Sequence, residues 1–172
     1  IMSDKKHLID KIESKNLFLL ILIQIEDFEI LDRFYNILTV DKIEKMFAFN
    51  MLSYLPNAYV FENIYNIGNG RYALLADFFD FASSETNIIE YLETFVKNIR
   101  KSILIVDEIE YDLNIIVSYS FGKEHLYEDA KCGLDEAINK KMLIKYANDS
   151  SIHDHIEAKK NMEVIKMVKI AL

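Results

Sequence analysis

Hydrophobic positions recur along the chain with two different periods. The apolar run over 17–25 has the length of a strand, and its lack of alternation predicts a central strand buried on both faces. The segment 41–55 carries Ile43, Phe47, Met51 and Leu55 at helical spacing. The segment 112–122 instead alternates and is rich in β-branched residues, which favours a strand. Both element types are therefore expected in one chain.

The same reading predicts the order of elements over the whole sequence. Helices are expected over 4–14, 28–35, 41–55, 85–101, 124–139 and 157–172. Strands are expected over 17–25, 59–67, 72–78, 112–122 and 141–147. Strands and helices are interspersed, and two strands form an apparent hairpin, which predicts an α+β fold with helices packed on a mixed sheet.

The predicted hairpin turn is Gly68, Asn69 and Gly70, between the strands 59–67 and 72–78. Asn-Gly between two strand-like runs is the strongest short-range hairpin signal. Glycine adopts a positive φ without steric cost, and asparagine tolerates it better than most residues. A simple turn therefore explains this segment unless other residues indicate a site.

Composition narrows the class of protein. A chain of 172 residues with 51% apolar residues suits one folded domain with a substantial core. Its net charge of −8 argues against a nucleic-acid surface, which needs clustered Lys and Arg. The single cysteine, Cys132, cannot form an internal disulfide, so a reducing, cytoplasmic setting is expected. The longest apolar run, 17–23, is far shorter than the ~20 residues that cross a bilayer, so no membrane insertion is expected.

The two ends of the sequence suggest a piece of a larger protein. Ile1 precedes Met2, and the last residues stop within a helical pattern. We therefore expect a domain over 1–150 and a C-terminal helix over 151–172. An apolar stripe on that helix indicates either a linker towards a following domain or a helix packed on its own domain. The stripe comprises Ala158, Met162, Ile165, Met167 or Val168, and Leu172.

Four landmarks in this order give the chain a family resemblance. They are "QIEDFEILDR" (24–33), "GNGRY" (68–72), "SYSFG" (118–122) and "AKCGLDEAI" (130–138). In order and separation they resemble the GGDEF family, the diguanylate cyclase domain of bacterial cyclic di-GMP signalling, over about residues 4–150. The resemblance implies a nucleotidyl-cyclase-like fold: a central mixed, largely antiparallel sheet of about five strands flanked by helices, with a signature β-hairpin. It also suggests a following EAL-type phosphodiesterase domain.

The residues that depart from the family pattern are those that would hold metal. The family condenses two GTP molecules with divalent cations, which need hard oxygen ligands. The resemblance places two key carboxylates at positions 24 and 70, where this chain has Gln24 and Gly70. The fourth motif position, normally Glu, is Arg71, and the fifth is Tyr72. The sequence therefore predicts a degenerate motif with no catalytic residue and no metal site. Glu26 is either a residual candidate for a cation ligand or a solvated carboxylate at the end of the strand.

The nucleotide pocket is less clearly altered. The resemblance places the guanine-recognising residues at Asp32 and Asp41, and a carboxylate can accept hydrogen bonds from guanine. Both acids also suit ordinary solvated helix positions. Arg71 is a further candidate for phosphate contact, whereas the family's triphosphate-binding Lys falls on Ile138. The family's R-x-x-D product-inhibition site falls on 59–62 and contains no arginine.

The sequence leaves three functional hypotheses. The first is a catalytically inactive GGDEF domain that acts as a regulatory and dimerisation module. It needs no cofactor, has GTP as a candidate ligand, and regulates an adjacent EAL or receptor domain, as a homodimer. The second is an enzyme with altered nucleotide-processing activity that uses Glu26, Asp41 and Arg71. The third is an unrelated α+β interaction domain that shares the element order by chance.

Overall fold

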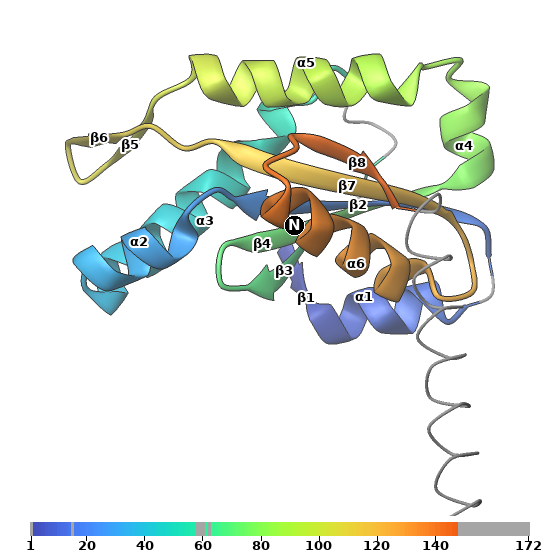
Figure 1. Cartoon of the computed structure of the whole chain (residues 1–172), viewed down its shortest axis with the longest axis horizontal. Coiled ribbons are helices and arrows are strands. Elements are labelled where there is room, and N and C mark those ends of the chain that lie inside the picture. The colour runs from blue at the N-terminus through green and yellow to red at the C-terminus, as the bar shows by residue number, and fades with distance from the viewer. Residues whose placement is uncertain (1, 15, 58–60, 62, 148–172) are drawn as a thin grey trace, which may run out of the picture.

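A six-stranded mixed sheet forms the centre of the molecule, with helices on both of its faces (Figure 1). The computed structural model describes residues 2–14, 16–57, 61 and 63–147. In chain order the elements are β1 (Met2–Asp4), α1 (Lys5–Ile12), β2 (Phe18–Ile25), α2 (Phe28–Phe34), α3 (Ile37–Tyr54), β3 (Ile64–Gly68), β4 (Arg71–Asp77), α4 (Phe78–Ser83), α5 (Ile88–Lys101), β5 (Leu104–Val106), β6 (Ile109–Tyr111), β7 (Ile115–Gly122), α6 (Leu126–Asn139) and β8 (Ile144–Tyr146).

The strand order in the sheet is β1-β3-β4-β2-β7-β8. The pairs β3–β4, β4–β2 and β2–β7 are antiparallel, whereas β1 and β8 are added in parallel at the two edges. Strands β5 and β6 form a separate two-stranded hairpin. The predicted α+β fold with a largely antiparallel mixed sheet is therefore confirmed, with one more strand in the main sheet than expected.

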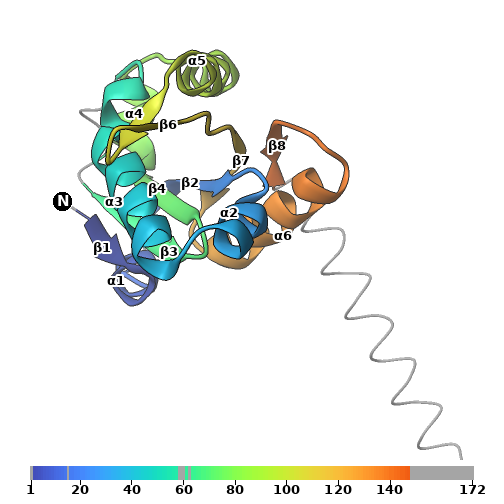
Figure 2. The same ribbon diagram turned by 90° about the vertical axis from the view of Figure 1, so that its left-hand side faces the viewer.

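Strand β2 carries the core on both of its faces. Its odd-numbered residues, such as Leu19 and Ile21, pack with α3 and α5 in one cluster. Its even-numbered residues, such as Leu20 and Leu22, pack with α1 and α6 in another. Figure 2 shows these helices on opposite sides of the sheet. Because side chains alternate along a strand, Gln24 belongs to the α1–α6 side.

Side-chain caps fix where several helices begin. The Asp4 carboxylate accepts a hydrogen bond from the His7 N–H at the start of α1. Asn36 caps α3 through the Thr39 N–H, so this helix begins four residues before the predicted start at 41. Asn87 caps α5. The predicted helix over 85–101 therefore begins at residue 88, after the separate short helix α4.

The remaining predictions agree in part with the structure. The strands 17–25 and 112–122 correspond to β2 and β7, and 72–78 corresponds to β4. The predicted strand 59–67 is represented by the shorter β3, and 141–147 by β8. The C-terminal helix, predicted over 151–172 with its pattern at 157–172, lies outside the described residues. Within the described part of the chain, no helix is both long and apolar enough to span a bilayer.

Candidate functional site

The β3–β4 hairpin is closed by Asn69 and Gly70, both with positive φ, of 53° and 73°. Two consecutive positive φ values are those of a type I′ turn, which matches the twist of the flanking strands. Gly68 pairs directly with Arg71, and a register shift between Asn66 and Gly68 marks a bulge before the turn. The Gly70 carbonyl accepts a hydrogen bond of 2.9 Å from the Ile25 N–H. The turn is thereby attached to the end of β2.

This attachment brings Gln24 and Arg71 together. The two residues are direct cross-strand partners on β2 and β4. Arg71 donates from Nε to Gln24 Oε1 over 2.9 Å, and its Nη2 lies 3.2 Å from Asp135 Oδ1 on α6. Gln24 Nε2 donates to the carbonyl of Asn69 over 3.1 Å. Both ends of the Gln24 amide therefore bind protein groups, and the Arg71 cation is held by a carboxylate.

Gly70 has no room for a side chain. A Cβ built at this residue would lie 2.5 Å from Cδ2 and 2.6 Å from Cγ of Phe28, the first residue of α2. Real Cβ contacts are not this short, and the Phe28 ring is itself buried in the core. The ring thus occupies the space into which any residue 70 side chain, including a carboxylate, would extend.

A cleft of about 560 Å³ lies beside these residues. Gln24, Asn69 and Arg71 line it, together with the beginning and middle of α2 and the segment after α6. Its charged lining residues are the four acids Glu26, Asp27, Glu29 and Asp32 and the two bases Arg71 and Lys141. The volume suits a small ligand. The excess of acids opposes a bare triphosphate.

The two predicted base-binding acids have different surroundings. Asp32 lines the cleft from α2. Asp41 is exposed on α3, where its carboxylate forms an ion pair of 2.8 Å with Lys45. Half-buried Glu44 lies near both acids and near the Gly70 backbone of the turn. Burial raises the pKa of Glu44, and the charges of Asp41 and Asp32 raise it further, while a hydrogen bond with the Gly70 backbone opposes the shift.

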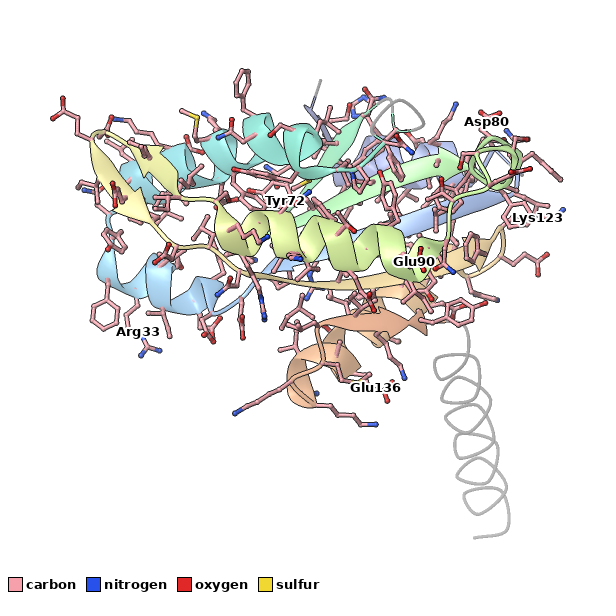
Figure 3. All side chains as sticks on the ribbon, turned by 90° about the horizontal axis from the view of Figure 1, so that it is seen from above. Arg33, Tyr72, Asp80, Glu90, Lys123 and Glu136 are labelled. Atoms are coloured by element: carbon pink, nitrogen blue, oxygen red, sulfur yellow. The ribbon has the colours of Figure 1, made fainter. Side chains whose placement is uncertain are left out.

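The other predicted residues have distinct surroundings. Glu26, the residue after the end of β2, lines the cleft together with Gln24 and Ile25. Tyr72 is fully buried, and its hydroxyl donates to the Glu44 carbonyl over 2.9 Å, so it joins the hairpin to α3 (Figure 3). Burial raises the pKa of the Tyr72 phenol well above its ordinary value. Ile138 lines the cleft, and so does Lys141, two residues after the end of α6.

The residues at this end of the sheet do not fit a divalent cation. Magnesium requires several oxygen ligands in octahedral geometry. The Gln24 side-chain oxygen accepts from a guanidinium, Gly70 has no side chain, and Arg71 places a positive charge at the same point. Among the described residues, no group of three or more His, Cys, Asp or Glu side chains is placed to hold a metal.

The structure places Gln24, Gly70 and Arg71 side by side, next to four residues that the sequence analysis did not consider as site residues. Asp135, Phe28, Glu44 and Lys141 complete the site, and none of them was identified as a site residue. Glu44 lies three residues after Asp41, so helical spacing could have placed it on nearly the same side of α3. Asp135 is 64 residues from Arg71, and no local pattern connects the two.

Comparison with known proteins identifies the fold. The sequence matches no protein-family model and no curated protein sequence. Among solved structures, the FimX GGDEF domain from Pseudomonas aeruginosa superposes with a TM-score of 0.65 at 12% identity, over 82% of this chain and 91% of that one. The architecture is therefore that of GGDEF domains, as the resemblance predicted.

Two further similar structures come from proteins named for two activities or for two domains. A diguanylate cyclase/phosphodiesterase from Caldicellulosiruptor saccharolyticus superposes with a TM-score of 0.63 at 18% identity, over 83% of this chain and 85% of that one. An EAL/GGDEF domain protein from M. capsulatus gives a TM-score of 0.65 at 10% identity, over 81% and 93%. At these identities the likeness concerns the fold, so the chemistry has to be argued from the residues of this chain.

Proposed function

We propose that this chain is a GGDEF-fold domain without cyclase activity that regulates a neighbouring domain. The observation that carries the proposal concerns positions 24 and 70, where the resemblance places the metal ligands and where this chain has Gln24 and Gly70. Arg71 engages the side-chain oxygen of Gln24, and the Phe28 ring fills the space beside Gly70. A guanidinium thus stands beside one position, and the other has no side chain.

The chemistry of the reaction supports this proposal. Phosphoryl transfer from GTP depends on metal ions to neutralise the charge that develops on the phosphates. Arg71 supplies one positive charge, but Asp135 already pairs with it, and four carboxylates line the same cleft. A triphosphate would meet net repulsion there, with no divalent cation to offset it. The retained fold then serves regulation rather than catalysis.

The neighbouring domain is proposed to be of the EAL type. Two similar structures come from proteins that carry phosphodiesterase or EAL in their names. In such an arrangement this domain would transmit a change of orientation or of ligand occupancy to a phosphodiesterase or receptor domain in the cytoplasm. GTP is a candidate ligand of the cleft, with Asp32 as the acceptor for the base, and because the acidic lining opposes the triphosphate we expect its binding to be weak.

The test is an assay for cyclic di-GMP with purified protein, GTP and Mg²⁺, read by mass spectrometry. We expect no product. Product that disappears in the Glu26→Ala variant would overturn the proposal, because it would show that a carboxylate of this cleft supports catalysis. Product unaffected by that substitution and by Arg71→Ala would identify a contaminating cyclase.

A GTP titration by calorimetry, with and without Mg²⁺, tests the ligand. We expect Mg²⁺ to change the affinity equally in the wild-type chain and in the Glu26→Ala variant, because the cation then acts on the charge of GTP and not through a ligand of the protein. A Mg²⁺ effect that disappears in Glu26→Ala would contradict the account of Arg71 and Gly70.

A further inference from the structure

The wall of the cleft next to α6 is the turn that leads into β8. This turn follows the end of α6 at Asn139 and precedes Ile144, the first residue of β8. Its residues Lys141, Met142 and Leu143 all line the cleft. A molecule that fills this part of the cleft therefore contacts the three residues immediately before β8.

The turn ends α6 as a Schellman motif. The Met142 N–H donates to the Ala137 carbonyl over 2.8 Å, which is the longer of the two backbone bonds in this motif along the chain. The Lys141 N–H donates to the Ile138 carbonyl over 3.3 Å, which is the second bond. Lys141 has a φ of 56° at a position where glycine is usual. Because a residue with a Cβ adopts this conformation at a cost, the surrounding structure holds the turn in a strained state.

Strand β8 lies at the edge of the main sheet, beside α6 (Figure 2). It has three residues, pairs in parallel with β7, and each of its residues is partly exposed. The Tyr146 ring stacks on Tyr119 of β7 with 5.0 Å between the centroids. Lys145 Nζ lies 3.9 Å from Glu136 Oε1 on α6. A short edge strand opens at a lower free energy than the central strands of a sheet, so β8 can respond to a change in the turn before it.

The far end of β8 is packed on α6. Ala147, the residue after β8, is fully buried. A Cβ built on Gly133 of α6 would lie 2.7 Å from the Ala147 Cβ, so the glycine is what allows the two backbones to approach this closely. Gly133 lies two residues before Asp135, which pairs with Arg71 of the hairpin. One helix thus contacts both the hairpin beside the cleft and the end of β8.

We propose that the turn 140–143, β8 and Ala147, which we call the relay, couple the cleft to the part of the chain that follows Ala147. The inference rests on the proposed regulatory function, to which it adds the path within the domain. When an occupant of the cleft holds the turn, β8 stays paired with β7 and Ala147 stays on Gly133. When the turn is released, β8 opens and the chain after Ala147 leaves this position. Because coupling is reciprocal, a change at Ala147 also alters the turn.

The first experiment changes the turn and follows β8 by hydrogen exchange and NMR of the full 172-residue chain. Lys141→Gly removes a Cβ from a left-handed residue and should slow the exchange of the β8 amides about fivefold. Lys141→Val places a β-branched residue there and should speed this exchange about tenfold. The amide chemical shifts of residues 148–156 should move in opposite directions in the two variants, because the two substitutions shift one equilibrium in opposite senses.

Glu85 provides the matched control. It has a φ of 54° and directly follows the C-cap of α4, so it has the same kind of position at a helix end as Lys141. It lies outside the residues that line the cleft. Glu85→Gly and Glu85→Val should therefore leave both the β8 exchange rates and the shifts of residues 148–156 at their wild-type values.

The second experiment starts from the other end of the relay. Gly133→Ala forces Ala147 away from α6 and should speed the exchange of the Met142 amide, which belongs to the turn. Adding Ala147→Gly removes the contact at 2.7 Å and should return this rate towards the wild-type value. The reversal separates an effect that passes through Ala147 from a direct effect of the substitution on α6.

The proposal is wrong if the Lys141 variants alter the turn but neither β8 nor residues 148–156, if the Glu85 variants produce the same changes, or if Ala147→Gly does not reverse the effect of Gly133→Ala. Circular dichroism of each variant confirms that it is folded, and the Lys141 variants alone decide the matter if Gly133→Ala does not fold. Cyclase activity would refute the proposed function and leave these measurements unchanged, whereas an uncoupled relay would leave the cyclic di-GMP assay unchanged.

Discussion

Replacing Gly70 by alanine is expected to destabilise the domain by about 2–5 kcal/mol, as the sum of two terms. The backbone of Gly70 has a φ of 73°, in the left-handed region. A residue with a Cβ costs ~1–2 kcal/mol there. The new Cβ also meets the Phe28 ring at 2.5 Å. Overpacking of this kind costs ~1–3 kcal/mol.

A double-mutant cycle with Phe28→Ala separates the two terms. Without the ring, the nearest remaining atom is the Phe28 Cβ at 3.0 Å, so Gly70→Ala should then cost only the backbone term, ~1–2 kcal/mol. The coupling is therefore ~1–3 kcal/mol. Phe28→Ala alone should cost ~3–5 kcal/mol.

The cycle is measured by urea unfolding of all four proteins, followed by circular dichroism. A constant concentration of trimethylamine N-oxide keeps the double variant folded. Equal costs of Gly70→Ala with and without the ring would refute the argument that Phe28 excludes a side chain at position 70. A cost below about 1 kcal/mol in the wild-type background would refute the backbone term as well.

Two further predictions concern the groups around the hairpin. Arg71→Ala should lower the free energy of unfolding by about 1.5–3 kcal/mol, since a charged donor to Gln24 is lost. Asp135→Asn should lower it by only ~0.2–1 kcal/mol, because Asp135 is half exposed. Equal urea midpoints for the two variants would contradict this order. Glu44 has a pKa raised above 4.5, so the folded state binds its proton more tightly than the unfolded state. This tighter proton binding adds to the free energy of unfolding at low pH, and the added stability is lost as pH rises from about 4.5 through the folded pKa of Glu44. Glu44→Gln should remove this decrease in the free energy of unfolding, measured by urea titrations at pH values from about 4.5 up to the folded pKa. The same pH profile in the variant and the wild type would contradict the prediction.

Strong local signals explain which elements were predictable. Strand β2 is an apolar run, and the β3–β4 turn contains glycine, so both were identified. The β5–β6 hairpin was missed because its turn residues, Asp107 and Glu108, adopt positive φ values of 51° and 67° without any glycine to indicate a turn. Strand β1 has only three residues, and its parallel pairing with β3 brings together residues about 62 positions apart. The periodicity of hydrophobic positions in the sequence does not indicate which distant strands pair.

The candidate site was predictable at the level of position but not of contact. The resemblance aligned Gln24 with the hairpin, and the cross-strand pairing of Gln24 and Arg71 confirms that they are adjacent. What the sequence could not show is how these residues are used. The packing of Phe28 on Gly70 and the reach of Arg71 to α6 depend on how α2 and α6 lie against the sheet. Tertiary packing determines both.

The unusual residues at this end of the sheet depend on one another. With Gln24 neutral, the cation of Arg71 has one carboxylate partner among the described residues, Asp135, so these three side chains are balanced in charge. A carboxylate at position 24 would form an ion pair with Arg71 rather than remain available to a metal. A carboxylate at position 70 would first require the Phe28 ring to move. A change at position 24 or 70 towards the carboxylates that the resemblance implies therefore meets a residue that pairs with it or excludes it, Arg71 in one case and Phe28 in the other.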